Sequence, residues 1–573
     1  MNETPEGFGG TDWQGILSRD SFLERDAGAR AKALLDTGSM RVLLGPFDRL
    51  ESPWLEPQGI VPQSDDGVVI ARGTIGGQPV VVASIEQGFQ GGGTGEVSGA
   101  KISQLLKHAV SESRSGHPTA AVLLLETGGV RLQEANLGLN AVAEICSAVL
   151  DLRRHVPVVG VVAGTVGSFG GVSIAAGLCS RLVVTAQARI GLNGPAVIEQ
   201  EAGVQEFDST DKKLIWAIDG GEQRVLTGLA DILVLDDVCE IRSAVTAAVT
   251  APPSLPGTHR SERTDVLSSR LALLDPAHLP EPRQLQQLWG QAFEVNSDAK
   301  FDGSRSAPAA AGRGATWLRA LATQSAPVTP SVLRGDSADA VYLAVCPDPN
   351  SPFHRAREGQ VGLAEALVLA EQVRDVITAD ASIEPVDKRA IVAVVDLPSQ
   401  AYGRLEEMAG LHQAIAASVD AYHAARTAGH AVIALVVGQA LSGGFLAHGL
   451  QANQILALDD PSVEIHAMHK PAAARITLRT VAELDELAQI IKPLSYNVRD
   501  WAQLGFCDGL LTVTNPDAPS TEDVALVHDA VAQAVVRARS GPLDLSNRMS
   551  SAAAAINRAA SITVRDRLIK QWS

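Results

Sequence analysis

The chain has 573 residues, a formal net charge of −18 and 46% hydrophobic residues. This acidic balance argues against a nucleic-acid-binding protein, which needs a basic face. The five cysteines lie far apart without a C-x-x-C pair, which argues against a disulfide framework or a zinc ribbon and favours a reducing cytoplasm. The length exceeds one ordinary domain, and the aromatic content of only 4% predicts cores built from Ala, Val, Leu and Ile.

The first half predicts alternating strands and helices. Gly67–Gln87 alternates apolar residues around a Gly-Gly turn, as in a β-hairpin, and Gly91–Lys107 is a glycine-rich loop that runs into a helix. Further on, the pattern indicates strands at 120–125, 158–162 and 182–185, separated by helices at 130–155 and 170–178. Such alternation favours a mostly parallel sheet covered by helices.

One stretch, Val156–Ser180, has no charged residue and is long enough to span a bilayer. Its glycines and Pro157 instead favour a buried strand, a turn and the start of a buried helix. The first residues, Met1–Gln14, lack the basic start and apolar run of a signal peptide. We therefore expect a cytoplasmic protein that does not cross a membrane.

A second alternating series begins at Tyr342–Val345. Between the two series the composition changes, with a Pro-rich segment after Ala251 and a low-complexity stretch, Ser306–Gly314, that is typical of a flexible linker. We predict a first domain over residues 1–300, a linker over 301–335 and a second domain over 336–573.

The two series repeat the same elements at a separation of about 270 residues. The strand and turn LLLETGG (Leu123–Gly129) corresponds to VVDLPSQ (Val394–Gln400). A long Ala-rich helix follows each, and then a second strand and glycine turn, in Val158–Gly171 and Val432–Gly444. One shared offset across several elements indicates duplication, so the fold class is α/β with two homologous domains.

The glycine turns are the main chemical equipment of the sequence. Backbone N–H groups at a helix start have no partner within the helix, the helix dipole adds partial positive charge there, and glycine allows close approach. Gly128–Gly129, Gly170–Gly171 and Ser442–Gly443–Gly444 therefore predict oxyanion holes suited to thioester enolates. The alternative is that these glycines only permit tight packing. Their recurrence in successive turns and in both domains favours the functional interpretation.

Other motifs give less. No nucleotide-binding P-loop, nucleophile elbow or metal-ligand spacing is present, and Gly91–Gly95 alone is a weak phosphate signal. Asp396, at a strand end, is better explained as a turn or helix-capping carboxylate. His466 lies in the segment HAMHK and has both a structural and a catalytic interpretation.

Long motifs carry a family resemblance over nearly the whole chain. In the first half they are LGPFDRLESPW (44–54), GGGTGEVSGAKI (91–102), ETGGVRLQEANLGL (126–139), GLNGP (191–195) and GGEQR (220–224). In the second they are VDLPSQAYGRLEE (395–407), AHGLQAN (447–453) and HAMHKPAAARIT (466–477). The chain resembles the carboxyltransferase domains of acyl-CoA carboxylases, in the crotonase superfamily. Within that group it is most similar to fused β and γ subunits of biotin-independent malonate decarboxylase.

This resemblance implies a carbon–carbon lyase that decarboxylates a malonyl-thioester and that binds no metal or other cofactor of its own. The substrate is carried on the CoA-like phosphopantetheine arm of an acyl-carrier subunit. The resemblance places the thioester oxyanion hole at the N–H groups of Gly129 and Gly171, and directs Gly443 and Gly444 toward the carboxyl group. Supporting binding residues are Gly128, Gly170 and Ser442. His466, Tyr402 and water remain open as the proton donor.

The partners implied are the acyl-carrier and acyl-transferase subunits, together with further copies of this chain. Because acyl carriers are typically acidic, we expect a local basic rim at the pocket mouth, with Lys101, Arg153 and Arg154 as candidates. The second domain departs from the carboxyltransferase pattern, since SQAYG stands where a glycine-led turn is usual. Two alternatives remain: a biotin-dependent acyl-CoA carboxyltransferase and a non-catalytic scaffold that binds the carrier.

Overall fold

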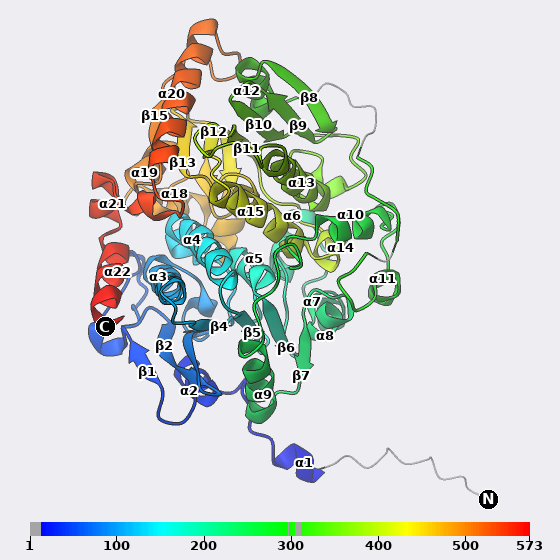
Figure 1. Ribbon diagram of the computed structural model, residues 1–573, viewed down its shortest axis with the longest axis vertical. Coiled ribbons are helices and arrows are strands. Elements are labelled where there is room, and N and C mark those ends of the chain that lie inside the picture. The colour runs from blue at the N-terminus through cyan, green and yellow to red at the C-terminus, as the bar shows by residue number, and fades with distance from the viewer. Residues whose placement is uncertain (1–12, 296, 304–310, 573) are drawn as a thin grey trace, which may run out of the picture.

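The computed structural model describes residues 13–295, 297–303 and 311–572, and its two sheets lie one in each half of the chain (Figure 1). The first sheet has seven strands in the order β1-β2-β3-β4-β5-β6-β7. Their bounds are β1 (Arg41–Leu43), β2 (Val68–Ile75), β3 (Gln78–Ile85), β4 (Ala120–Leu124), β5 (Val158–Val162), β6 (Arg181–Thr185) and β7 (Ile232–Val234).

The second sheet has the order β15-β13-β12-β11-β10-β9-β8, and β14 pairs with β12. Its strands are β8 (Gln324–Thr329), β9 (Val332–Asp336), β10 (Ala340–Val345), β11 (Ala390–Leu397), β12 (Val432–Leu441), β13 (Gln454–Leu458), β14 (Ile465–His466) and β15 (Gly509–Leu511). Each sheet begins with antiparallel strands and continues as a parallel run, β3 to β7 and β10 to β15. The predicted duplication of an α/β domain is therefore confirmed.

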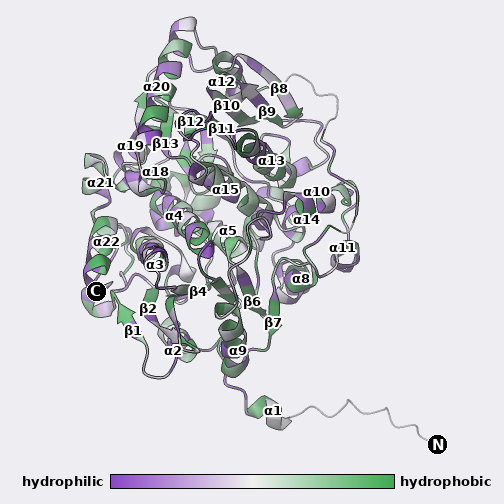
Figure 2. Ribbon diagram, in the orientation of Figure 1, coloured by the Kyte–Doolittle hydropathy of each residue, from purple (hydrophilic) through white to green (hydrophobic). Residues whose placement is uncertain are grey.

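The inner parallel strands, among them β4, β5, β11 and β13, are buried on both faces, as their near-continuous Val, Ile, Leu and Ala sequences require, whereas the edge strands β7 and β15 are only partly buried. Figure 2 shows the strands β4 and β6 mainly in hydrophobic colours. In the first domain the main helices are α2 (Ala27–Leu34), α3 (Glu96–Arg114), α4 (Ala135–Arg153), α5 (Gly171–Leu178), α6 (Pro195–Ala202), α7 (Lys212–Asp219), α8 (Gly221–Leu226), α9 (Val238–Val249), α10 (Thr264–Ala272) and α11 (Pro282–Trp289). A short helix, α1 (Trp13–Leu17), precedes them.

The second domain repeats the pairing of two long helices. Its helices are α12 (Arg313–Leu321), α13 (Leu363–Ala379), α14 (Arg404–Met408), α15 (Leu411–Thr427), α16 (Ser442–Ala447), α17 (Lys470–Ile476), α18 (Val481–Ala488), α19 (Val498–Gln503), α20 (Thr521–Ser540), α21 (Ala552–Asn557) and α22 (Ala559–Trp572). Helix α3 packs on α4, and α13 packs on α15 in the same way. Helices α4 and α5 then meet α15 in the middle of the molecule, where the two domains join (Figure 1).

Helix α4 is buried almost all round, because every residue except Asp151 is buried. Within the described residues, the segment Leu132–Arg153 is the one helix that is long and apolar enough to cross a membrane, and 94% of its apolar window is buried inside the protein. The core helix of a folded domain meets the same criterion. The uncharged segment Val156–Ser180 forms β5, a turn and α5, as predicted.

The predicted linker over 301–335 is too long. Residues 304–310, most of the low-complexity stretch, lie outside the described part of the chain, but α12, β8 and β9 belong to the second sheet and its cover. The cause is apolar burial, since Trp317 and Leu318 are buried and the indole N–H of Trp317 donates to the Pro516 carbonyl at 2.8 Å. The second domain therefore begins near Arg313.

The end of the chain returns to the first domain. Helix α22 lies beside α3 (Figure 1), and the ring of Trp572 stacks on His108 with centroids 4.5 Å apart. The same end of the chain is also joined to α4, where the carboxylate of Glu144 pairs with the guanidinium groups of Arg558, at 3.3 Å, and of Arg565. Burial opposes ionisation of Glu144, but the two guanidinium groups lower its pKa to about 2.

We expect Glu144→Gln to lower the free energy of unfolding by about 3–5 kcal/mol near neutral pH, because it leaves buried guanidinium groups unpaired. The folded protein keeps this carboxyl ionised to about pH 2, whereas its ordinary pKa is 4.5. The stabilisation is therefore complete above about pH 4.5 and is lost as the pH falls toward 2. Denaturant melts across this range measure both effects. Asp485→Asn, which breaks a half-exposed pair with Lys470, is the control, with an expected loss below about 1 kcal/mol.

Candidate functional site

Two glycine turns of the first domain touch each other. Gly129, after β4, has φ +111°, and Gly170, after β5, has φ 58° and ψ −151°, a region open almost only to glycine. A Cβ added to Gly170 would lie 3.0 Å from the Cα of Gly129, and the reverse substitution would meet the Gly170 Cα at the same distance. The close approach of the two backbones therefore requires glycine on both sides.

Glu126, two residues beyond the end of β4, holds the turn after β5 in place. The Glu126 carboxylate accepts hydrogen bonds from the N–H groups of Ala163, at 3.0 Å, of Gly164, and of Gly167, at 3.3 Å. Burial raises the pKa of Glu126, and these amide donors oppose that rise. Asp396 has a similar role in the second domain, where it accepts from the N–H groups of Gly314, in the first turn of α12, and Gln439, in β12, so of its two predicted roles the contacts favour the one at a helix start.

The free donors at the contact are the N–H groups of Val130 and Gly171. The Gly129 N–H, predicted to form the oxyanion hole, already donates to the Thr127 hydroxyl at 2.9 Å. At Val130 the neighbouring backbone groups bond to Thr94 on one side, which turns the Val130 N–H to the other. Gly171 is the first residue of α5, where a helix N–H has no internal partner. Across the described residues, neither N–H meets a protein acceptor.

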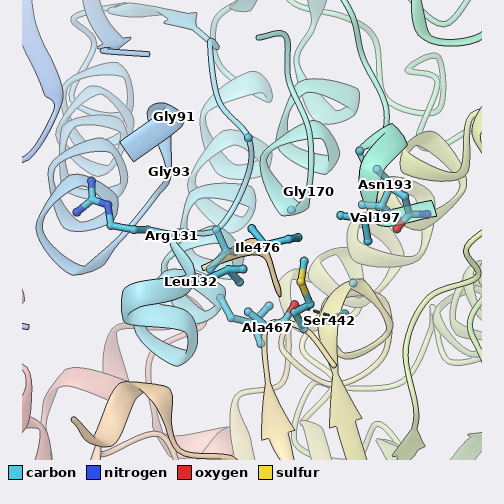
Figure 3. Close-up of a pocket in the computed structure, with 18 of the residues that line it drawn as sticks. Gly91, Gly93, Arg131, Leu132, Gly170, Asn193, Val197, Ser442, Ala467 and Ile476 are labelled. Carbon is cyan, nitrogen blue, oxygen red and sulfur yellow. Dashed lines mark hydrogen bonds between the residues drawn. The ribbon is translucent and has the colours of Figure 1, made fainter. Parts of the chain in front are cut away.

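Both donors line a cavity of about 360 Å³ between the two domains. In Figure 3, Gly91, Gly170 and Asn193 lie across this cavity from Ser442 and Ala467. The lining residues are Gln90, Gly91, Gly93, Gly128, Val130, Arg131, Leu132, Gln133, Leu139, Gly170, Gly171, Leu192, Asn193, Gly194 and Val197 from the first domain, and Gln400, Ser442, Gly443, Leu446, Ala467, Met468, Ile476 and Thr477 from the second. One chain therefore supplies both walls.

The lining mixes apolar side chains with uncharged polar ones. Among its described residues Arg131 alone is charged, and its guanidinium is bound to Asp66 and Glu134, at 2.9 and 2.8 Å, and points away from the cavity centre (Figure 3). The predicted binding residues Gly128, Gly170 and Ser442 all line the cavity, as do Gly171 and Gly443.

In the second domain, helix α16 begins at the cavity wall. The Gly443 N–H, predicted as an oxyanion donor, is bound to the Gln400 side-chain oxygen at 2.7 Å. Gly444 does not line the cavity, because it packs against backbone: its Cβ position is 2.7 Å from the Ser399 carbonyl oxygen. The predicted donor at Gly443 is therefore occupied by a side chain, and Gly444 does not face the cavity, which corrects the sequence prediction for both residues.

Ser442 has a left-handed backbone, with φ 57°, although it has a side chain. Such a conformation costs about 1–2 kcal/mol outside glycine. The Ser442 hydroxyl donates to the Ala467 carbonyl at 2.9 Å, and the Tyr402 hydroxyl lies 3.5 Å behind it. Strain at a cavity wall of this kind is typical of functional positions.

His466 does not line the cavity. Its ring is buried, stacks on Tyr496 at 3.9 Å between centroids, and has Nδ1 2.9 Å from the Met468 carbonyl. Burial lowers its pKa to about 3, so the imidazole is neutral near pH 7. It therefore fails as a cationic proton donor, and the structural interpretation is the better one.

The predicted basic rim is wrong for all three residues. Lys101 is fully buried and donates to the carbonyls of Asp65 and Val68, and burial lowers its pKa to about 8. Arg153 is buried at the domain interface and pairs with Asp420 at 2.7 Å. Arg154 is exposed, but it lies at the far end of α4, about 22 Å along the helix from the cavity residue Leu139 at 1.5 Å per residue.

Contacts across the interface shape the loop at 191–194. The Glu407 carboxylate, on α14, accepts from the backbone N–H groups of Leu192, at 2.9 Å, and Asn193, at 2.8 Å. Arg224 donates to the carbonyls of Ile190, at 2.8 Å, and Glu407, at 2.9 Å. The second domain therefore sets the position of a first-domain cavity loop.

As regards metals, the described residues contain no group of three or more His, Cys, Asp or Glu side chains that could hold an ion.

Comparisons with known proteins match each half of the chain to a different family model. The family model for the malonate decarboxylase gamma subunit matches residues 356–572, and the carboxyl transferase domain model matches residues 29–275. The malonyl-S-ACP:biotin-protein carboxyltransferase MADC of Malonomonas rubra is 35% identical over 295 residues, which cover 49% of this chain and 92% of MADC. MADD of the same organism is 37% identical over 141 residues, 24% of this chain and 48% of MADD.

Among solved structures, a chain of a Pseudomonas malonate decarboxylase hetero-tetramer in complex with malonate has 56% sequence identity. The match covers 48% of this chain and 100% of that chain, with a TM-score of 0.47. The fold and the site define a pair of carboxyltransferase-type domains that enclose one cavity. The chain belongs to the malonate decarboxylase family, and it joins a β-type and a γ-type subunit in one polypeptide.

We expect Gly170→Ala to lower the free energy of unfolding by about 1–3 kcal/mol, because a Cβ meets Gly129 and forces a backbone region that alanine avoids. Gly194→Ala is the matched control in the same cavity wall. Gly194 has φ −64°, and its Cβ position has no atom within 4 Å. Chemical denaturation compares the two, and equal stabilities would contradict the required contact between the turns.

Proposed function

We propose that this chain is a malonyl-thioester decarboxylase, the carbon–carbon lyase component of a biotin-independent malonate decarboxylase. Its substrate is a malonyl group on the phosphopantetheine-type arm of an acyl-carrier protein, and its products are the acetyl-thioester and carbon dioxide. The observation that carries the proposal is a pair of N–H groups, those of Val130 and Gly171, that line one interdomain cavity and meet no acceptor in the described part of the chain. The family of the chain supports the same substrate class.

The reaction needs a place for negative charge. When the bond between the α-carbon and the carboxyl group breaks, its electron pair moves toward the thioester carbonyl and forms an enolate. Two fixed N–H donors at that oxygen stabilise the enolate more than the neutral thioester, and one such donor contributes about 3 kcal/mol in other enzymes. The backbone holds both donors rigidly, because the two glycine turns touch.

The rest of the cavity favours departure of carbon dioxide. Apart from Arg131, whose guanidinium is bound elsewhere, the described lining has no charged side chain to pair with the malonyl carboxylate. An unpaired carboxylate in such surroundings is less stable than in water, and it loses its charge on becoming carbon dioxide. The enolate then takes a proton at its α-carbon. We assign the route to the Tyr402–Ser442 hydroxyl pair and water rather than to His466.

The wider assembly follows from the substrate. A carrier-bound thioester requires an acyl-carrier protein and an acyl-transferase that loads it, so we propose both as partners, in the cytoplasm. No cofactor within this chain has a step in the scheme. We also propose that the chain forms a homo-oligomer.

The direct test is release of carbon dioxide from a malonyl-thioester by the purified chain. We expect release from malonyl-carrier without biotin or a biotinyl protein. Release that depends on a biotinyl protein would favour the carboxyltransferase alternative, and tight carrier binding without release would favour the scaffold alternative. Isotope-labelled carboxyl carbon measures the release in each case.

Gly171 allows a sharper test of the donor pair. Gly171 is the first residue of α5, a position that accepts proline, so Gly171→Pro removes the N–H and preserves the helix. Its Cβ would press on Val142 and Leu446, at 2.8 and 2.9 Å, so Gly171→Ala is the control with the same Cβ and an intact donor.

We expect the proline variant to lose a further ~10²–10³-fold in kcat relative to the alanine variant. Single-turnover decarboxylation measures the difference, and circular dichroism checks the fold of both variants. Equal rates for the two variants would show that the Gly171 N–H does not stabilise the transition state.

A further inference from the structure

Gln400 is locked between the two domains. It belongs to the turn SQAYG that follows β11, it lines the cavity, and only 6% of its surface is exposed. Its side-chain oxygen accepts from the Gly443 N–H at 2.7 Å, and its amide nitrogen donates to the Asn193 side-chain oxygen at 2.6 Å. Both ends of the amide are therefore fixed.

Asn193 is itself held firmly. Its side-chain nitrogen donates to the Ala401 carbonyl at 2.9 Å and to the Glu407 carboxylate at 2.8 Å. These bonds fix the orientation of the Asn193 oxygen as an acceptor, and through it the orientation of the Gln400 amide. Gln400 therefore presents its oxygen, not its nitrogen, to the Gly443 N–H.

Gly443 occupies the place in the second domain that Gly171 has in the first. Each follows a residue with φ near +57°, Ser442 and Gly170, at the start of the helix after the second strand of the repeat. The Gly171 N–H has no acceptor among the described residues, whereas the Gly443 N–H is occupied. The duplicated domains therefore differ in whether this N–H at the helix start is free to bind an anion.

We propose that Gln400 is a specificity-determining residue that keeps the Gly443 donor closed, so that the malonyl carboxylate cannot bind the Gly443 N–H before it leaves. The proposal rests on the decarboxylase function above. It also gives a reason why the carboxyl group leaves as free carbon dioxide. A second molecule that took up this group would develop negative charge, and a protein N–H group would be needed to stabilise that charge. Gln400 acts by occupying the Gly443 N–H and takes no part in bond making.

The expected kinetics follow from ground-state binding. A freed Gly443 N–H would form a charge-assisted hydrogen bond to the malonyl carboxylate, and this bond is lost as neutral carbon dioxide departs. An interaction stronger in the ground state than in the transition state lowers KM and kcat together. Removal of Gln400 should therefore tighten binding of the substrate and slow its turnover.

The test compares Gln400→Ala with Gln400→Met. Alanine frees the donor and opens space before it, whereas methionine has nearly the same length as glutamine, accepts no comparable hydrogen bond and covers the donor. Calorimetric titration with malonate gives the affinity without turnover, and steady-state assays with malonyl-pantetheine give kcat and KM. We expect Gln400→Ala to bind malonate about tenfold to a hundredfold more tightly than the wild type, with kcat and KM both reduced. Gln400→Met should show no such gain.

Equal malonate affinities in the wild type and Gln400→Ala, or the same gain in Gln400→Met, would overturn the role of Gln400. Gln400→Gly provides a second opened variant if the alanine protein does not fold, as judged by its melting temperature. Absence of carbon dioxide release by the wild type would overturn the decarboxylase function instead. The two failures are distinguishable, because malonate binding is measured without catalysis.

Discussion

The contact between Gly129 and Gly170 is the constraint on which the site depends. Two turns from successive strand–helix units approach so closely that no Cβ fits on either side. This approach brings the N–H of Val130 and the N–H that begins α5 to the same cavity wall. Neither donor needs a flexible side chain to reach its position, so little conformational entropy is lost when an anion binds there.

The supporting structure exists to hold these turns. The buried carboxylate of Glu126 accepts hydrogen bonds from three N–H groups of the turn after β5. The hydroxyl of Thr127 accepts from the Gly129 N–H, which does not face the cavity. Both side chains are buried, and backbone N–H groups satisfy them. A buried polar network of this kind is rigid when it is complete and costly when one member is removed.

Much of this was predictable from the sequence, and the misses have physical causes. The strands, the duplication and the glycine turns follow from apolar patterns and local turn chemistry. The shift of the donor from Gly129 to Val130 depends on the hydrogen bond that the Gly129 N–H donates to the Thr127 hydroxyl and on a backbone bridge to Thr94, neither of which leaves a periodic signal in the sequence. In the turn after β4 the glycines mark the turn in the sequence, but the free N–H belongs to Val130, the residue that follows them.

The predicted positions of the charged residues were wrong for a related reason. Lys101 and Arg153 are buried because carbonyl groups and Asp420, 267 residues from Arg153, satisfy them in the fold, and a partner at that distance is invisible in one sequence. His466 is neutral because aromatic packing on Tyr496 buries it. The unusual SQAYG was visible, and it was the correct place to look, but only the structure shows that its Gln400 closes a donor.

The division of labour between the domains also explains why the two halves depend on each other. The first domain contributes the open donors, but its loop at Leu192–Asn193 is fixed by Glu407 and Gln400 of the second. A cavity built in this way is complete only while the interface is intact. Joining the halves in one chain replaces a bimolecular association with an intramolecular one, which raises the effective concentration of each half for the other. The buried Arg153–Asp420 pair lies at the same interface. If the two domains packed in a shifted position, these charges would be buried without partners, so the shifted arrangement would be less stable. Fusion and the buried ion pair therefore act in the same direction, and both preserve the geometry that the touching glycine turns define.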